Sequence, residues 1–208
     1  MKTLFFVLTL LVACEPADVE LSENDEKQIG AEDHTGAYGV LEEVLEPVGV
    51  IGAADCQQID IGDKACNFRL ADQNGDTWDL YSHLGDVILL DFSTVWCPPC
   101  QAAGHYMQPL QDDYKSEGVQ IVTILIDGVT GGTAPTETEV DEWVTEHNIT
   151  SAPVLEGSRD KMFDPAAVNG YALAAFPTYI YIGRDMKFYA GHVGFSDEYV
   201  RQRLEEGL

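Results

Sequence analysis

The sequence predicts an α/β domain over residues 60–208 of the 208-residue chain. Residues 87–94 form an apolar run with a single acid, which is typical of a strand buried on both faces. Apolar side chains at helical spacing follow over residues 101–115, and a second apolar run follows at 119–126. Alternation of strands and helices in this manner is typical of an α/β fold.

Residues 1–13 predict a signal peptide. One lysine precedes an apolar run that ends at Ala13, is too short to span a membrane and leads into acidic residues. The alternative is a buried N-terminal strand or helix. The segment ends in Leu-Val-Ala-Cys14, which resembles a bacterial lipobox and implies that Cys14 is acylated. Glu15 after the cysteine, rather than aspartate, favours the outer membrane.

Two further segments precede the domain. Residues 14–37 predict a lipid-anchored, disordered tether, because residues 15–33 carry eight acids, one base and few large apolar side chains. Residues 38–59 are mildly apolar and predict an N-terminal extension that packs on the domain as a strand or a helix.

The net charge of −25 excludes two kinds of partner. So acidic a chain repels the phosphate backbone of nucleic acids, and anionic lipid headgroups do not attract it. The charge is consistent with solubility or a salty medium, and the alternative is an acidic docking surface for a basic partner.

The five cysteines are Cys14, Cys56, Cys66, Cys97 and Cys100. If Cys14 is acylated, four remain and allow three pairings, of which the local one joins Cys97 to Cys100 and Cys56 to Cys66. We expect Cys56–Cys66 to be a structural disulfide, because its spacing lacks the helix start that tunes reactive thiols; the alternative is a second redox pair.

Cys97 and Cys100 lie where the predicted strand ends and a helix begins. The positive end of a helix stabilises a thiolate and lowers the pKa of the thiol at Cys97. Cys100 lies one turn further on, within reach of a mixed disulfide formed at Cys97. We expect the attacking thiol to be exposed and the second thiol to be partly shielded. The alternatives are a structural disulfide or half of a zinc site.

The segment Asp91-Phe-Ser-Thr-Val-Trp-Cys-Pro-Pro-Cys100 resembles the active-site segment of the thioredoxin superfamily. The likeness is greatest to the membrane-tethered TlpA/ResA-like thiol–disulfide oxidoreductases of bacterial envelopes, and it extends over about residues 60–206. It implies a thioredoxin-like fold with a central mixed sheet flanked by helices. The segments that we assign to it begin with an opening hairpin at 61–75. The strands lie near 87–94, 119–126, 178–183 and 187–193, and the helices lie near 98–116, 136–147 and 196–206. Residues 128–135 and 156–173 are expected to form connections or insertions near the active-site side.

The resemblance also implies a role for each site residue. Cys97 attacks, Cys100 resolves, Pro177 forms a cis peptide bond beside the disulfide, and Trp96 covers the disulfide. Asp91 is the buried acid whose pKa is raised and which shuttles a proton to or from Cys100. The alternatives are an ordinary trans-proline at Pro177 and a structural acid at Asp91.

Two positions depart from the pattern. Ala103 stands where many of these proteins have a glutamate, so Asp91 is expected to take over that function. The helix-kinking proline is missing near His105, although Pro109 can kink the helix further on. His105 is expected to be a packing or surface residue.

These observations predict a lipid-anchored, periplasm-facing oxidoreductase that exchanges electrons with cysteines of envelope proteins and needs no cofactor or metal. The resemblance favours reduction, for instance of apocytochrome c before haem attachment, with a membrane protein as electron donor. The alternative is a copper chaperone that uses Cys97, Cys100 and His192, since thiolates and imidazole suit copper. A peroxidase is less favoured, because the threonine-rich loop around a lone cysteine is absent.

Overall fold

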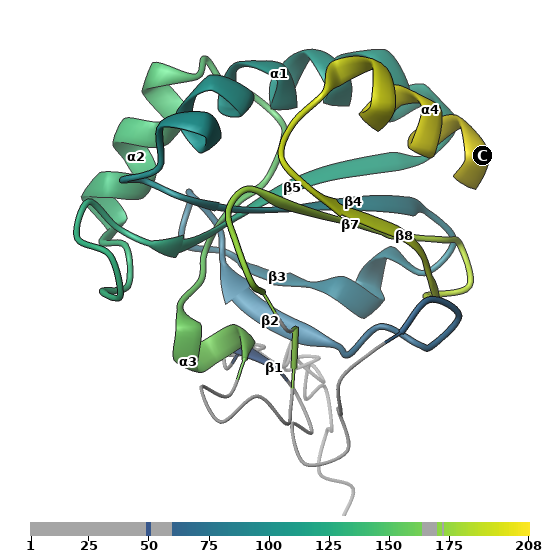
Figure 1. Cartoon of the computed structure of the whole chain (residues 1–208), viewed down its shortest axis with the longest axis horizontal. Helices are drawn as coiled ribbons and strands as arrows, with labels where there is room; N and C mark the ends of the chain where they lie inside the picture. Colours follow the sequence, from purple (N-terminus) through teal and green to yellow (C-terminus); the bar gives the residue numbers. More distant parts are fainter. Residues whose placement is uncertain (1–48, 51–59, 164–169, 172) are drawn as a thin grey trace, which may run out of the picture. The chain divides into compact units, whose positions relative to one another are not determined.

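The structure is a computed structural model that describes residues 49–50, 60–163, 170–171 and 173–208, all within one compact unit of residues 43–208. Its centre is a five-stranded sheet in the order β6-β5-β4-β7-β8 (Figure 1). The strands are β4 (Val87–Thr94), β5 (Val119–Asp127), β6 (Val154–Glu156), β7 (Thr178–Ile182) and β8 (Phe188–Val193). β4, β5 and β6 are parallel and β7 is antiparallel to its neighbours, so the sheet is mixed, as predicted.

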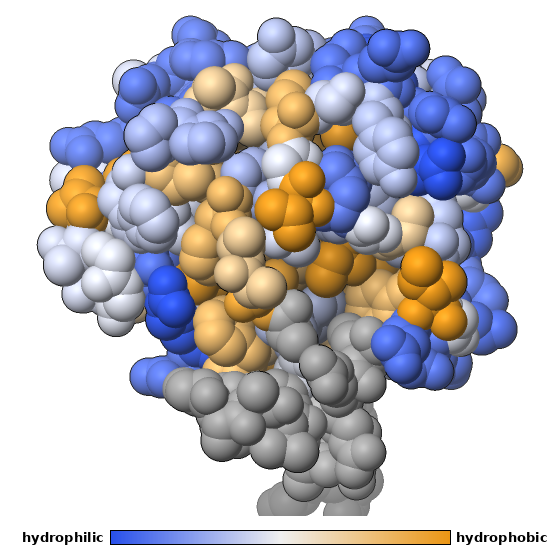
Figure 2. Space-filling view, in the orientation of Figure 1, coloured by the Kyte–Doolittle hydropathy of each residue, from blue (hydrophilic) through white to orange (hydrophobic). Residues whose placement is uncertain are grey.

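Three helices cover one face of this sheet (Figure 1). They are α1 (Pro98–Tyr114), which the short η2 (Lys115–Glu117) extends, α2 (Glu137–Glu146) and α4 (Asp197–Gly207). Each turns buried side chains toward the sheet, while its outer surface is mainly hydrophilic (Figure 2). Among the described residues, no helix combines the length and the apolar character that crossing a membrane requires.

A second, three-stranded sheet covers the opposite face (Figure 1). It contains β1 (Gly49–Val50), β2 (Phe68–Ala71) and β3 (Thr77–Asp79), all antiparallel, followed by the short η1 (Leu80–His83). The one-turn helix α3 (Arg159–Met162) packs beside it. β1 lies within the predicted N-terminal extension, so the described part of that extension is a strand.

The buried strand β4 organises both layers. All eight of its residues are buried, which confirms the prediction from the apolar run. Leu89 faces α1 and α4, whereas Leu90 and Phe92 face the second sheet. Burial of each such side chain contributes roughly 1.5–3 kcal/mol to folding. The strand is therefore fixed from both sides where it leads into the cysteine pair.

The helix starts follow from local sequence. Pro98 and Pro99 occupy the first positions of α1, where their missing N–H groups leave nothing unpaired. Thr136 and Glu139 form a capping box at the start of α2, in which each side chain accepts from the backbone N–H of the other. Both helices begin within a residue of their predicted starts.

The predicted fold class is confirmed, and two details were wrong. The segment at 156–173 was assigned as a connection, but it contains α3 and the last residue of β6. Both elements are too short to show a periodic pattern. The opening hairpin consists of β2 and β3, so it lies several residues after the predicted 61–75. The proposed signal peptide (1–13) and tether (14–37) lie outside the described residues.

Candidate active site

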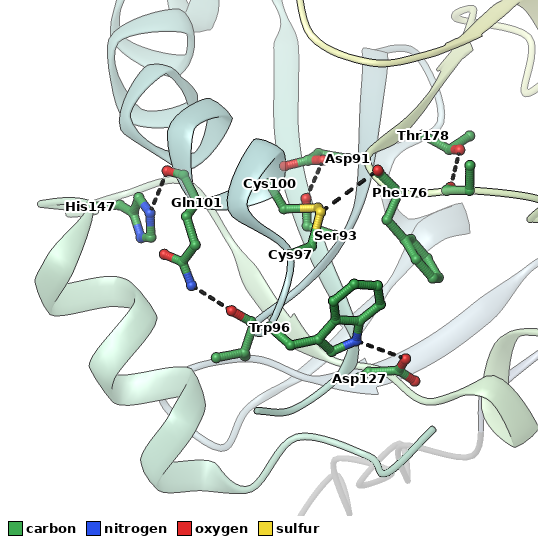
Figure 3. Close-up of a disulfide and its surroundings, with 12 residues drawn as sticks. Asp91, Ser93, Trp96, Cys97, Cys100, Gln101, Asp127, His147, Phe176 and Thr178 are labelled. Atoms are coloured by element: carbon green, nitrogen blue, oxygen red, sulfur yellow. Dashed lines mark hydrogen bonds between the residues drawn. A yellow bond between two sulfur atoms is a disulfide. The ribbon is translucent and has the colours of Figure 1, made fainter. Parts of the chain in front are cut away.

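The predicted cysteine pair forms a disulfide at the junction of β4 and α1 (Figure 3). The Cα atoms of Cys97 and Cys100 are 5.2 Å apart. Cys97 is the N-cap of α1 in an extended conformation, and its side chain does not cap the helix. Its sulfur atom therefore lies at the positive end of a 17-residue helix.

The two cysteines differ less in exposure than predicted. Cys97 is 4% exposed and Cys100 is fully buried, because each sulfur covers the other in the disulfide and apolar side chains of α2 and β5 pack around them. The exposed surface next to the pair comes from Trp96, Pro98 and Pro99. The expectation of an exposed Cys97 is corrected: in the disulfide this residue is almost completely buried.

A loop before β7 lies against Cys97. The Phe176–Pro177 peptide bond is cis, as predicted. The carbonyl oxygen of Phe176 lies 3.7 Å from the Cys97 sulfur (Figure 3). Thr178 then enters β7, which pairs with β4. The pairing of the two strands thus brings residues 79 positions apart to the same site.

Asp91 is fully buried in β4, on the face that α1 and α4 cover. Its carboxylate accepts hydrogen bonds from Ser93 Oγ at 2.7 Å and from Thr123 Oγ1 at 3.4 Å. Burial raises the pKa of Asp91 to about 7, and the hydroxyl groups of Ser93, Thr123 and Tyr179 lower it only in part. This acid therefore changes charge close to neutral pH.

A second buried acid was not singled out from the sequence. Asp127, at the end of β5, is paired with Arg159 of α3, whose Nε and Nη2 donate at 2.8 and 2.6 Å. Trp96 Nε1 donates to the same carboxylate at 3.2 Å (Figure 3). Burial alone would raise the pKa of Asp127, but these hydrogen bonds, one from the Gly132 backbone and the charge of Arg159 lower it.

The Arg159 side chain links this acid to the loop with the cis bond. Its guanidinium lies 5.8 Å from the ring centre of Phe176, and its side chain is 41% exposed. The Trp96 indole is positioned by its hydrogen bond to Asp127. That this indole covers the disulfide stays a prediction. No sequence pattern indicated that Asp127 would pair with Arg159, which lies 32 positions away on a one-turn helix.

The remaining predicted residues have other surroundings. His192 stacks on Tyr179 and Tyr181, and the described residues contain no cluster of three or more His, Cys, Asp or Glu suited to a metal ion. The structure therefore does not group His192 with Cys97 and Cys100 as the copper alternative expects. Ala103 is fully buried in α1, and His105 packs against His147.

Two predicted cysteine roles are not tested. Cys14, the predicted acylation site, and Cys56 lie outside the described residues. Cys66 is half-buried just before β2. The structural disulfide between Cys56 and Cys66 therefore stays a prediction.

A cysteine pair at the start of a helix, facing a cis-proline loop on a mixed sheet, defines the thioredoxin class of protein. A family model described as AhpC/TSA family matches residues 61–188, which is more than half of the chain. The chain therefore belongs to the AhpC/TSA family.

Known relatives carry a consistent description. Thiol-disulfide oxidoreductase ResA of Bacillus cereus is 28% identical over 152 residues, covering 73% of this chain and 79% of that protein. ResA of Oceanobacillus iheyensis is 34% identical over 94 residues, covering 43% of this chain, and the match spans less than half of that protein, 45%. The crystal structure of a proposed thiol:disulfide interchange protein DsbE from Chlorobium tepidum is 27% identical, with a TM-score of 0.57 over 72% of this chain and 98% of that one. By class the chain is a thioredoxin-like thiol–disulfide oxidoreductase.

Proposed function

We propose that this protein exchanges two electrons with cysteines of other proteins through the Cys97–Cys100 pair. The observation that carries the proposal is the placement of this disulfide at the start of α1, with the Phe176 carbonyl 3.7 Å from the Cys97 sulfur. A thiolate at that position is stabilised by the helix end.

In the reducing direction, the Cys97 thiolate attacks one sulfur of a substrate disulfide. A bond forms between Cys97 and the substrate, and the other substrate sulfur leaves as a thiolate. Cys100 then loses its proton and attacks the Cys97 sulfur. The Cys97–substrate bond breaks, the Cys97–Cys100 disulfide forms, and the substrate retains two electrons. In the oxidising direction the same steps run backwards.

Asp91 is the proposed acceptor of the Cys100 proton. It is buried on the helix-covered face of β4 and is drawn among the residues around the disulfide (Figure 3). Because burial raises its pKa to about 7, it can both accept and release a proton near neutral pH. A carboxyl with an ordinary pKa would be a poor base for a thiol under the same conditions.

Substrate is proposed to bind over the opening beside Cys97. Exposed apolar side chains are available at this end of the sheet, at Trp96 on the strand–helix junction and at Val193 on the last residue of β8. Pro177 has no N–H and the Phe176 carbonyl faces the sulfur, so an extended substrate segment would meet a fixed backbone there.

We also propose an envelope location, with acylation at Cys14 and with reduction of envelope proteins such as apocytochrome c as the direction of transfer. The support is the signal-like segment at residues 1–14 and the description of the relatives as ResA and DsbE proteins. A membrane protein would then supply the electrons. No cofactor is needed, because the cysteine pair itself carries both electrons.

Mixed-disulfide trapping tests the proposed exchange. Reduced Cys100→Ser and Cys97→Ser variants are each mixed with insulin, whose disulfides serve as the probe. Cys100→Ser is expected to accumulate a dithiothreitol-sensitive adduct at Cys97, and Cys97→Ser is expected to form none. Equal trapping by the two variants would contradict the assignment of the attacking thiol.

The direction of transfer is tested by the reduction potential of the pair in dithiothreitol or glutathione buffers, with thiols trapped for mass spectrometry. A potential near or below that of thioredoxin, about −270 mV, is expected for a reductant. A value near that of DsbA, about −120 mV, would contradict the cytochrome-maturation role.

A further inference from the structure

A row of polar side chains crosses the central sheet from its core to its edge. In the strand register, Asp91 of β4 lies opposite Tyr179 of β7, and Tyr179 lies opposite His192 of β8. Directly opposed residues project from the same face of a sheet, here the face covered by α1 and α4. Because β8 is an edge strand, these three residues form a transverse row that runs outward from Asp91.

The rings of the transverse row are in contact. The ring centres of Tyr179 and His192 are 5.0 Å apart and stacked. Tyr181 also stacks on the His192 ring, with ring centres 5.7 Å apart, and Tyr199 of α4 meets the His192 ring edge-on at 4.6 Å. Tyr199 is 38% exposed, so the contacts extend from a fully buried acid to the surface.

Two of the three residues in the row, Tyr179 and His192, have side-chain polar atoms without a partner in the part of the chain that the structure describes. The Tyr179 hydroxyl and both ring nitrogens of His192 are buried without a hydrogen-bond partner among the described residues. The strand register places Tyr179 directly opposite Asp91, and the Tyr179 hydroxyl lowers the pKa of this acid. An unpaired buried hydroxyl destabilises the fold, and phenylalanine at position 179 would avoid this cost.

Unpaired polar groups that adjoin a titrating acid point to a proton path rather than to packing. A buried water molecule needs about two to four polar partners, and the Asp91 carboxyl, the Tyr179 hydroxyl and the His192 ring supply groups of that kind side by side. The row also has an inner end at Asp91, where the proposed function produces a proton.

We propose that Tyr179 and His192 form a proton path between Asp91 and the edge of the sheet at β8. The inference rests on the proposed function, in which Asp91 takes the Cys100 proton. After that step Asp91 is a neutral acid and must release one proton before the next cycle. Tyr179 takes this proton on its oxygen while it donates its own hydrogen to His192, directly or through water. His192 passes one proton through water to the solvent at the edge of the sheet, so each group returns to its starting state.

The charges around His192 suit a transient carrier. Tyr179 and Tyr181 of β7 and Tyr199 and Arg203 of α4 are the titratable and charged groups that face it. Burial and the positive charge of Arg203 lower the pKa of His192. The ring is therefore neutral at rest and gives up an added proton readily.

The test uses the full chain with Cys14, Cys56 and Cys66 each replaced by alanine, so that Cys97 and Cys100 are the two thiols that react. The reduced protein is mixed with Ellman's reagent and observed by stopped flow. The first thionitrobenzoate is released when Cys97 is modified. The second is released when Cys100 displaces it and gives up a proton, so this step reports the path. The variants are Asp91→Asn, Tyr179→Phe and His192→Ala, and Tyr181→Phe is the matched control. Tyr181 also stacks on His192 and carries a buried hydroxyl with no partner among the described residues, but it lies opposite Leu89 rather than Asp91.

Tyr179→Phe and His192→Ala are expected to slow the second release about tenfold, less than the 10²–10⁴-fold loss typical of a removed general base, which is expected for Asp91→Asn. Added imidazole is expected to restore His192→Ala, and Tyr181→Phe is expected to match the wild type. If His192→Ala were slow only because of a structural defect, added imidazole would not restore its rate.

The outcomes separate the two proposals. If Asp91→Asn is slow while Tyr179→Phe and His192→Ala match Tyr181→Phe, the proton path is wrong and the role of Asp91 stands. If Asp91→Asn releases both groups at the wild-type rate, the proposed proton acceptor is wrong and the path is wrong with it. If His192→Ala does not fold, His192→Gln and Tyr179→Phe, which keeps the ring, give the same comparison.

Discussion

Two aspartates are fully buried near the disulfide, and they differ in almost every other respect. Asp91 lies within β4 and accepts hydrogen bonds from Ser93 and Thr123, which carry no charge. Asp127 lies at the end of the neighbouring β5, and its carboxylate accepts hydrogen bonds from Nε and Nη2 of the Arg159 guanidinium. Burial dominates at Asp91 and raises its pKa to about 7, whereas the arginine lowers the pKa of Asp127.

The difference shows that burial alone does not define a proton acceptor. A buried carboxylate with a bidentate cation stays ionised and fixes its neighbours, here Trp96 and α3. A buried carboxyl with only hydroxyl partners changes charge at working pH and can take part in proton transfer. The following variants exchange or remove these partners.

Asp91→Asn is expected to have the largest effect on stability. The pKa of Asp91 in the folded protein lies above its ordinary value of 3.8, so the contribution of this one group to stability is greatest at low pH and is lost as pH rises to about 7. Asparagine removes this loss, and the variant should exceed the wild type by at most about 4 kcal/mol near pH 9 and by little near pH 3. Urea unfolding of the oxidised proteins at each pH measures this difference in the free energy of unfolding, and Asp76→Asn, at an exposed position, is the control. A difference that does not vary with pH would contradict the account.

Arg159→Met should leave Asp127 as a buried carboxyl without a cationic partner, which is the situation of Asp91. The buried carboxylate loses its cation, and the expected destabilisation is about 1–3 kcal/mol at neutral pH, since half-exposure of the arginine moderates the effect. The wild-type contribution is present above the usual carboxyl range and is lost as pH falls, so the difference between the proteins should shrink in acid. Arg201→Met, which breaks the exposed pairs with Asp113 and Asp197, is the control. Equal effects of the two substitutions would contradict a special role for Asp127.

Trp96→Phe should have the smallest effect. It removes one hydrogen bond from a half-exposed indole to Asp127, which contributes about 1 kcal/mol. A double-mutant cycle with Asp127→Asn isolates this contribution from packing. A coupling free energy of zero would mean that the indole is held by its other contacts and that Asp127 does not position it.

The sequence alone predicted one of these aspartates because of its local context. Asp91 is the only acid in an apolar run, and an acid in a buried strand needs a reason. Asp127 ends its strand, where an acid is ordinary. Its partner Arg159 lies on a four-residue helix, too short for a periodic pattern to reveal.

The fold was also predictable where local sequence context is clear, and its prediction failed at the short elements. The long strands and helices carry clear hydrophobic periods, and the cysteine pair and Pro177 come from a recognisable order of motifs. The register that places His192 opposite Tyr179 depends on the pairing of β7 with β8. No single segment contains that information, so the sequence suggested a metal ligand at His192 where the structure has a stacked ring.

The most direct test of the central claim is a carbon-13 NMR titration of the aspartate side chains in the oxidised protein, assigned with Asp91→Asn and Asp127→Asn. We predict that the Asp91 carboxyl titrates near pH 7. We predict that the pKa of Asp127 lies below its ordinary value of 3.8, so that this carboxylate is ionised throughout the neutral range. If Asp91 titrates in the ordinary carboxyl range, it is ionised at neutral pH and cannot be the tuned proton acceptor proposed for Cys100.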